Sequence, residues 1–179
     1  MKKIYFVLTY TGTVLSRVVH IYTKNEFSHC SIALDGELNE MYSFGRYQAY
    51  NPFFGGFVKE NIDTGVYKRF YNTTSAIYSL EVTNRQYKLI KREIKKMNKE
   101  KDKYRYNFLG VAAIIFNRKL KRKNKYYCSE FVKYLVDVGN VDNNLPDIVK
   151  PQDFQNIDNV ELIYKGKLRD FNKEDNSLV

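Results

Sequence analysis

The sequence contains no tryptophan, only two cysteines and only three prolines. Two cysteines cannot form a disulfide framework, and no C-x-x-C or H-E-x-x-H spacing occurs, so neither a disulfide-rich scaffold nor a structural zinc site is expected. No D-x-D-x-D-G pattern or paired carboxylates indicate calcium binding or glycoside chemistry. No apolar run approaches the ~20 residues that a membrane span needs. These absences point to a globular domain that folds on its own hydrophobic core.

The length and composition are those of one such domain. The chain has 179 residues, of which 44% are apolar and 28% charged, and these values exclude disorder over the whole chain. There is no internal repeat or low-complexity linker, so we expect a single domain over residues 1–170 and a polar tail at 171–179. Aromatic residues reach 16%, with 16 tyrosines and 12 phenylalanines, which favours strands and half-buried surfaces.

The net charge of +10 is concentrated in the middle of the chain. Residues 85–125 contain 16 Lys or Arg against 3 Asp or Glu, whereas the segments on either side are close to neutral or acidic. Apolar residues in its first part recur at helical spacing, so the lysines are expected on the outward face of one or two helices, to one side of any active site. This basic stripe is either a solvated helix face or a surface for an anionic membrane or nucleic acid, although no named nucleic-acid motif accompanies it.

The N-terminus imitates a secretory signal, because Met1-Lys2-Lys3 precedes apolar residues. The apolar run Ile4–Leu8 is shorter than the roughly 7–15 residues of a signal h-region, and no A-x-A cleavage site follows. The segment is therefore interpreted as a buried strand, and a cytoplasmic location is expected.

The pattern of apolar residues and turn signals predicts an α+β domain. Asp35-Gly36 is a strong hairpin signal, Thr83 is a plausible N-cap, and Gly139 stops the last helix. Helices mixed with an antiparallel hairpin are typical of the α+β class. The predicted strands cover residues 3–9, 28–34, 37–44, 77–82 and 162–165, and the predicted helices cover 84–99, 106–116 and 128–138. The stretch 12–24 is expected to be a loop or a short helix, and 48–75 to be irregular.

The hairpin brings together residues that can do chemistry. A two-residue turn at Asp35-Gly36 would pair Ser31 with Glu40 and His29 with Tyr42, and alternation would place all four on one face. Glu40 would then lie diagonally across from His29, where a carboxylate can fix the tautomer of an imidazole and stabilise its charged form. The alternative is a cross-strand surface pair without a catalytic role.

Cys128 stands where a basic loop becomes an amphipathic helix. A thiol at a helix N-terminus has its thiolate favoured by unsatisfied N–H groups and by the helix dipole, and the same N–H groups could hold an oxyanion. The alternative is a small buried apolar residue. The other cysteine, Cys30, points to the opposite side of its strand from His29 and is expected in the core, and His20 is expected to be structural.

The order of a His on a hairpin strand, a polar partner on the next strand and a Cys opening a late helix resembles the circularly permuted papain-like branch of the NlpC/P60 superfamily. That branch includes YiiX-like and lecithin:retinol-acyltransferase-like proteins. The segment from Met41 to Phe57 also looks like uncharacterised proteins of this type from Gram-positive bacteria. The matching segments are Phe27–Leu34, Asn39–Tyr42, Tyr127–Val132 and Pro151–Phe154.

The resemblance implies a permuted papain-like fold, in which an antiparallel sheet packs against helices and the Cys lies at a helix N-terminus. It implies a thiol hydrolase, an amidase or peptidase, that uses Cys128 as nucleophile, His29 as general base and Glu40 as the orienting third residue. No metal or organic cofactor is required for this chemistry. Tyr42, Tyr127 and Ser31 are the candidate substrate-binding side chains.

The substrate implied is a peptide, or a small molecule with an amide or acyl bond. Two alternatives stay open at this point. An acyltransferase would use the same residues with a different acceptor. A non-catalytic binding module would use the basic segment 85–125 on an anionic membrane surface or on nucleic acid, because a fold does not determine a function.

Overall fold

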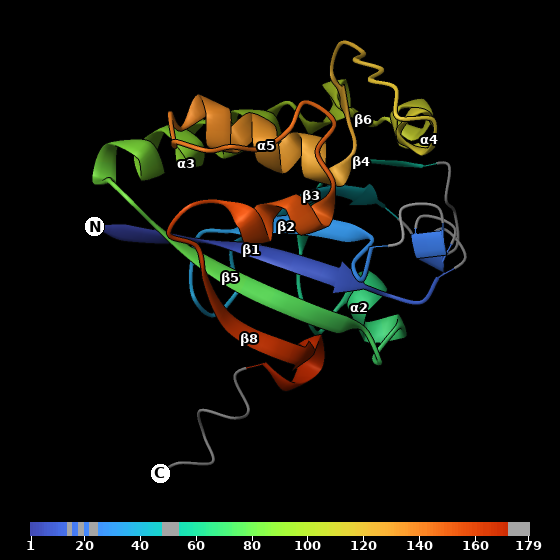
Figure 1. Cartoon of the computed structure of the whole chain (residues 1–179), viewed down its shortest axis with the longest axis horizontal. Helices are drawn as coiled ribbons and strands as arrows, with labels where there is room; N and C mark the ends of the chain where they lie inside the picture. Colours follow the sequence, from blue (N-terminus) through green and yellow to red (C-terminus); the bar gives the residue numbers. More distant parts are fainter. Residues whose placement is uncertain (14–15, 18–19, 22–24, 48–53, 172–179) are drawn as a thin grey trace.

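The computed structural model describes residues 1–13, 16–17, 20–21, 25–47 and 54–171. Six strands form one antiparallel sheet in the order β4-β3-β2-β1-β5-β8, and the helices α3 and α5 lie over one of its faces (Figure 1). The predicted α+β class with an antiparallel sheet is thereby confirmed.

The elements have the following bounds. The strands are β1 (Lys2–Tyr10), β2 (His29–Ala33), β3 (Met41–Arg46), β4 (Gly55–Glu60), β5 (Thr74–Val82), β8 (Glu161–Lys167) and a separate short parallel pair, β6 (Arg105–Tyr106) and β7 (Lys125–Tyr126). The helices are α2 (Gly65–Arg69), α3 (Asn84–Lys99), α4 (Phe108–Ile115) and α5 (Cys128–Val138), with 3₁₀ turns η1 (Lys101–Lys103), η2 (Pro151–Asn156) and η3 (Leu168–Asp170).

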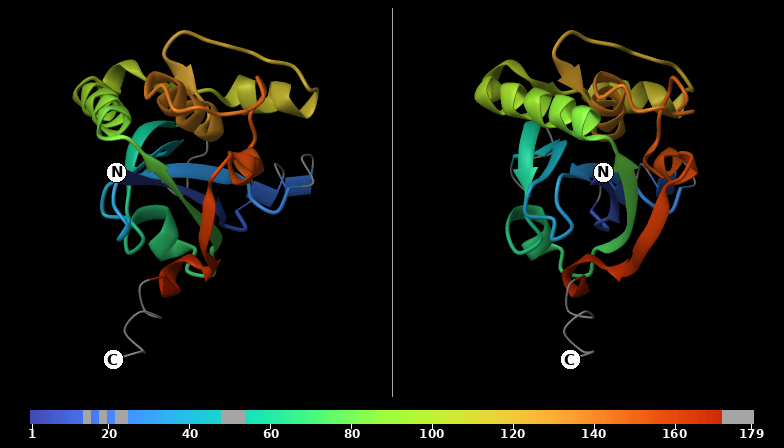
Figure 2. Two further views of the ribbon diagram at one scale, coloured as in Figure 1. Left: turned by 60° about the vertical axis from the view of Figure 1, so that its left-hand side comes forward. Right: turned by 90° about the vertical axis from the view of Figure 1, so that its left-hand side faces the viewer.

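Side chains alternate between the two faces of the sheet along each strand, and each face carries a buried cluster. The face toward α3 and α5 forms the main core, which includes Phe6 and Cys30, both 0% exposed. The predicted burial of Cys30 is confirmed. The opposite face packs against α2 and η3 in a second cluster that includes Val7 and Met41. Figure 2 shows the helical layer on one side of the curved sheet and α2 on the other.

Helix α3 has the bounds that its sequence predicts. The Thr83 hydroxyl accepts the Gln86 N–H and the Gln86 side chain accepts the Thr83 N–H, a capping box that fixes the start of the helix. Ile90, Ile94 and Met97 are buried toward the sheet. Most lysines of residues 85–125 are exposed, as predicted from the helical spacing.

Helix α5 is fixed by aromatic packing against the sheet. Phe131 is 0% exposed, and its ring centroid lies 5.0 Å from that of Phe44 and 5.7 Å from that of Phe57. We expect Phe131→Ala to lower the free energy of unfolding by about 3–5 kcal/mol, because it leaves a cavity between helix and sheet. Urea unfolding measures this loss. The control Asp137→Ala, an exposed position on the same helix, should change stability by only about 0.5 kcal/mol.

The hairpin between β2 and β3 forms, but its register differs from the predicted one. Asp35-Gly36 makes no two-residue turn. The backbone hydrogen bond nearest the loop is the one that the Leu34 N–H donates to the Glu40 carbonyl, at 3.1 Å. The Asp35 carboxylate accepts three backbone N–H groups from residues 37–40. Leu38, at a φ of 59°, buries its side chain in the second cluster. These contacts stabilise a longer loop. The predicted strand over 37–44 forms, but its predicted start at Glu37 is wrong, because the strand begins at Met41.

The longer loop changes which residues face each other. Tyr42 lies opposite Ile32, whereas a two-residue turn would have paired it with His29. The shift is three residues, an odd number, so each side chain of β3 lies on the other face from the one predicted. Ser43 therefore shares the face of Ser31, and Tyr42 joins the main core.

The stretch 48–75, taken as irregular from its sequence, contains β4, α2 and the start of β5. Strand β4 pairs with β3 along its whole length, from Arg46 opposite Gly55 to Met41 opposite Glu60. Its two glycines weaken the strand signal, since glycine has low strand propensity. Residues 48–53, and parts of the stretch 12–24, lie outside the described residues.

Within the described ranges, no helix is long and apolar enough to cross a membrane. The cytoplasmic location stays a prediction. Of the predicted polar tail, residues 172–179 lie outside the described part of the chain, and the single-domain boundary stays a prediction as well.

Candidate active site

His29 and Glu60 form an ion pair on one face of the sheet. His29 is the first residue of β2 and Glu60 the last residue of β4, and the His29 Nε2 lies 2.9 Å from Glu60 Oε1. The side chains are only 20% and 14% exposed. Strand β3 separates the two strands, so the glutamate side chain reaches across it to the imidazole.

Three hydroxyl groups hold the Glu60 carboxylate in place. Ser43 Oγ donates to Oε1 at 2.7 Å, Tyr67 OH donates to Oε2 at 3.2 Å, and Ser31 Oγ also donates to Oε2. Burial would raise the pKa of Glu60, but the charge of His29 and the hydrogen bonds from His29, Ser31 and Ser43 lower it below its ordinary value. Glu60 is therefore a fixed anion.

The environment of His29 favours its protonated form. Burial would lower its pKa, but the negative charge of Glu60, the hydrogen bonds to Cys128 and Glu60 and the charge of Cys128 raise the pKa of His29 to about 10. Because Nε2 is engaged by Glu60 and lies 3.3 Å from Ser31 Oγ, Nδ1 is the ring nitrogen that remains for Cys128.

Cys128 is the first residue of α5 and is 5% exposed. Burial would raise its pKa, but the hydrogen bond and charge of His29, together with the backbone N–H groups of Cys30 and Ser129, lower the pKa of Cys128 below its ordinary value. The start of a helix offers N–H groups that have no partner within the helix. The predicted position of Cys128 at the start of a helix is confirmed, and its ionisation stays a prediction.

Tyr106, at the end of β6, is the fourth side chain of the site, after Glu60, His29 and Cys128. It hydrogen-bonds to Cys128, and its ring contacts that of Phe108 at a centroid distance of 4.6 Å, tilted by 48°. Burial and the nearby charge of Cys128 raise the pKa of Tyr106 well above its usual value. The phenol therefore stays protonated and presents an O–H donor to the sulfur.

Two small hollows meet at this group of residues. One, of about 80 Å³, has His29 and Glu60 in its wall, and the other, of about 30 Å³, has Cys128 and Tyr127. Tyr106 and Ser28 line both hollows. Ser28 Oγ is buried and has no hydrogen-bond partner among the described residues, so the site offers one unused hydroxyl group.

The structure brings together some of the residues singled out in the sequence and separates others. Cys128, His29 and Tyr127 lie at the site, and Ser31 is buried beneath it as a partner of Glu60. Glu40 does not meet His29. Its carboxylate accepts a hydrogen bond from Lys91 Nζ at 2.7 Å and is 38% exposed, because the longer hairpin loop carries it away from the site.

Tyr42 also lies away from the site, on the face of the sheet that packs against the helices. It stacks on Phe57 at a centroid distance of 5.8 Å and belongs to the main core. The register shift that moves Glu40 therefore places Tyr42 on the opposite face of the sheet from His29.

Sequence reasoning missed Glu60 and Tyr106. Glu60 continues the alternation of Gly56 and Val58 along β4, and this period-2 pattern is the signal that could have placed it on the His29 face. No local signal in the sequence marks Tyr106, because its strand β6 has only two residues. The pairing of β6 with β7, which is distant in the chain, is what fixes the position of Tyr106.

The basic side chains of residues 85–125 lie outside the site, although Tyr106 of the same segment is part of it. The walls of both hollows include no Lys or Arg of residues 85–125 among the described residues. No group of three or more His, Cys, Asp or Glu side chains suited to hold a metal ion occurs in the described ranges. The groups available for chemistry at this site are therefore the side chains of Cys128, His29, Glu60 and Tyr106.

A scan against protein-family models finds no family that matches this chain, and a search of curated proteins finds no match. The geometry of the site is therefore the basis on which a function can be assigned.

Proposed function

We propose that the protein is a thiol hydrolase that cleaves an amide or ester bond. Cys128 is the nucleophile, His29 the general base and acid, and Glu60 the residue that orients His29. The observation that carries the proposal is the chain of contacts from Glu60 through His29 to Cys128, in which the pKa of the thiol is lowered and that of the imidazole is raised.

The chemistry follows from this arrangement. The Cys128 thiolate attacks the substrate carbonyl carbon, forming a C–S bond, and the carbonyl π electrons move to oxygen. The tetrahedral intermediate collapses as His29 gives its proton to the departing amine or alcohol. Water then attacks the thioester, His29 takes its proton, and the C–S bond breaks to release the acid and the thiolate. An amine or alcohol acceptor in place of water would make the same site an acyltransferase.

The oxyanion of the intermediate has two donors in reach of the reacting sulfur. One is the Cys128 N–H in the first turn of α5, and the other is the protonated Tyr106 hydroxyl. Ser28 Oγ, unpartnered among the described residues, is a further group for substrate.

The Tyr106 hydroxyl gives a prediction of its own. Tyr106→Phe should slow acylation of Cys128 about 100-fold, because it removes one donor to the developing negative charge. The rate of acylation by an activated ester measures the loss. Tyr126→Phe, on the neighbouring strand β7, is the matched control and should leave the rate unchanged. Equal rates in wild type and Tyr106→Phe would assign the oxyanion to other donors.

A permuted papain-like fold of the NlpC/P60 type is part of the proposal. It is supported by the order of His before Cys along the chain, by an antiparallel sheet that carries the His, and by a helix that begins at the Cys and packs on that sheet. Glu60, two strands from the His, takes the place of the third residue that the resemblance assigned to Glu40.

Covalent trapping tests the proposal without knowledge of the substrate. Incubation with p-nitrophenyl acetate should release p-nitrophenol in a burst and add one acetyl group to Cys128, as read by peptide mass spectrometry. Cys30→Ser is the matched control and should react like wild type, since burial and the charges of Cys128 and Glu60 raise the pKa of Cys30 well above its usual value. A burst that survives in Cys128→Ser would refute the assignment of the nucleophile.

A further inference from the structure

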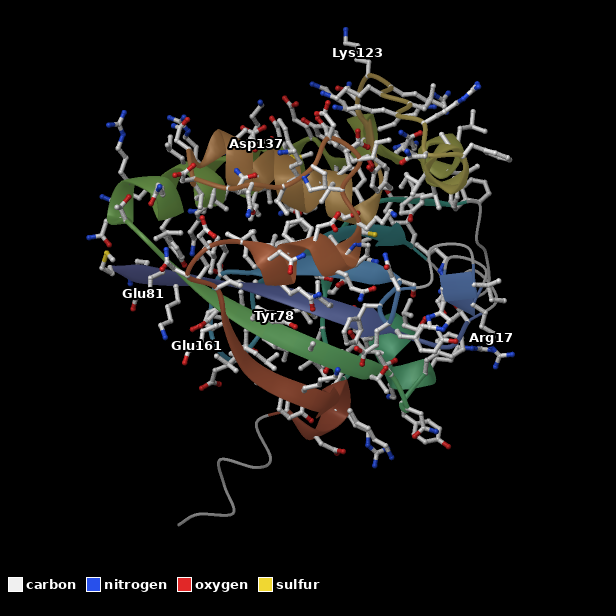
Figure 3. All side chains as sticks on the ribbon, in the orientation of Figure 1. Arg17, Tyr78, Glu81, Lys123, Asp137 and Glu161 are labelled. Atoms are coloured by element: carbon white, nitrogen blue, oxygen red, sulfur yellow. The ribbon has the colours of Figure 1, made fainter. Side chains whose placement is uncertain are left out.

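Helix α4 and the segment after it form a projection beside the site. Strands β6 and β7 pair at its base, and everything between them, residues 107–124, extends from the helical layer. Figure 2 shows the segment after α4 arching above the helices, and Figure 3 shows Lys123 at its tip, directed away from the sheet. We refer to residues 107–125 as the α4 projection.

The buried side chain of Asn107, which is 0% exposed, joins the start of α4 to the segment that follows the helix. Its Oδ1 accepts the Gly110 N–H at 3.1 Å and caps α4, while its Nδ2 donates to the Leu120 carbonyl at 2.9 Å. One side chain thus fixes the start of the helix and the returning segment beside each other. The projection presents a defined surface.

That surface exposes large apolar side chains. Leu109, Phe116 and Leu120 are 56%, 76% and 42% exposed. Leu109 and Phe116 are seven residues apart, two helical turns, so they share a face, and the Asn107 bond places Leu120 beside the start of that helix. Single exposed apolar residues are common, but three on one small projection indicate an interaction surface.

The same projection is strongly basic. Residues 107–125 contain six Lys or Arg and no Asp or Glu. Lys119 pairs with Asp147 at 2.6 Å, whereas Arg118, Lys121, Arg122 and Lys123 are exposed and make no ion pair with any described residue. Cations beside exposed aromatic and aliphatic side chains are the composition of surfaces that bind anionic lipid bilayers.

Helix α3 carries a second basic surface, with which the α4 projection can be compared. Its outer face carries as many cations, but none of its residues is among the large apolar side chains that the described chain exposes. A nucleic acid would be attracted to both surfaces alike through its phosphates. Only the α4 projection adds apolar groups that a hydrocarbon boundary would bury, and α3 and α4 lie at opposite ends of the helical layer (Figure 1).

We infer that the α4 projection docks on an anionic lipid bilayer, with Phe116 and Leu109 entering the headgroup boundary and the cations of residues 118–123 contacting lipid phosphates. Val111 and Ile114, on the same helix, line the hollow that contains Cys128. Docking therefore brings the entrance of the proposed catalytic site close to the lipid surface. The docking itself does not depend on the proposed catalysis.

Vesicle co-sedimentation of the full chain tests the inference. Wild type should bind vesicles of equal phosphatidylcholine and phosphatidylglycerol and not vesicles of phosphatidylcholine alone. The triple variant Lys121→Glu, Arg122→Glu, Lys123→Glu should lose at least tenfold in partitioning, and Phe116→Ser about tenfold. The matched triple variant on α3, Lys88→Glu, Arg92→Glu, Lys95→Glu, should lose less than about twofold. Cooperative unfolding at the wild-type temperature shows that each variant is folded.

Three results would overturn the inference. The first is no binding of wild type to the anionic vesicles, and the second is an equal loss in the α3 variant. The third is an unchanged affinity of Phe116→Ser together with equally tight binding to double-stranded DNA, which would show a general polyanion surface. Cys128→Ser should bind vesicles like wild type, so a failure of the proposed catalysis is distinguishable from a failure of docking.

Discussion

Replacing His29 with alanine is expected to slow alkylation of Cys128 by iodoacetamide at least tenfold at about pH 6. The variant loses the hydrogen bond and the positive charge that lower the thiol pKa, while the burial that raises it remains. The apparent pKa of labelling should therefore rise to about 8.5 or above, the value of an unassisted thiol. In wild type, labelling should be independent of pH over the range in which Cys128 is already a thiolate.

Alkylation rates are measured by mass spectrometry in a Cys30→Ser background, so that Cys128 is the cysteine that can be labelled. His20→Ala is the matched control, because His20 is the other histidine of the chain and its Nδ1 lies 2.5 Å from the carbonyl oxygen of Asn25, in a separate contact. Its pH profile should coincide with that of wild type. Coincident profiles for His29→Ala and wild type would remove His29 from the mechanism.

Replacing Glu60 with glutamine is expected to lower the free energy of unfolding by about 3 kcal/mol and to reduce thiolate formation at Cys128. Glutamine keeps an acceptor for the serine hydroxyls but leaves the buried His29 charge without its counter-ion, and breaking one side of a buried pair is costly. The pKa of His29 should fall, because the charge of Glu60 is the largest of the influences that raise it.

The pH dependence of this loss has a definite sign. The lowered pKa of Glu60 contributes stability above its ordinary value of 4.5, which is lost as pH falls through the folded-state pKa. The raised pKa of His29 contributes stability below 6.5, which is lost as pH rises toward about 10. The difference in free energy of unfolding between wild type and Glu60→Gln should be largest between pH 4.5 and 6.5, the two ordinary pKa values. It should become smaller at lower and at higher pH.

Glu40→Gln is the control for this experiment. Its carboxylate pairs with Lys91 at the surface, so the change in stability should stay within about 1 kcal/mol and labelling of Cys128 should be unaffected. Equal effects of the two substitutions would show that Glu60 has no special relation to His29. Chemical denaturation at several pH values measures both variants.

Helices α3, α4 and α5 were predictable because their signals are local, whereas the short helix α2 was missed. Thr83 with Gln86 forms the capping box of α3, and Gly139 ends α5 at the predicted residue. The burial of Cys30 and the position of Cys128 at a helix N-terminus follow from the same short-range patterns. Propensity, spacing and caps act within one or two turns, so they can be interpreted without knowledge of the tertiary fold.

The third residue at the site was not predictable by the same means. The Asp-Gly pair favours a two-residue turn, but the Asp35 carboxylate and the buried Leu38 stabilise a longer loop and shift the register by three. An odd shift exchanges the faces of a strand, which sends Glu40 to the surface and Ser43 to the site. Glu60 comes from a strand 31 positions after His29 in the chain, and only sheet pairing brings the two together.

The proposed mechanism requires that Cys128 be ionised at neutral pH, and thiolate absorbance near 240 nm measures this without a reagent that must reach the sulfur. The measurement is a pH titration of the difference spectrum between Cys30→Ser and the double variant Cys30→Ser, Cys128→Ser, in which the tyrosine contributions cancel. We expect a single step at a pH well below about 8.5 that moves upward when His29 is replaced by alanine. A step at or above about 8.5 that is the same with and without His29 would contradict the proposed mechanism.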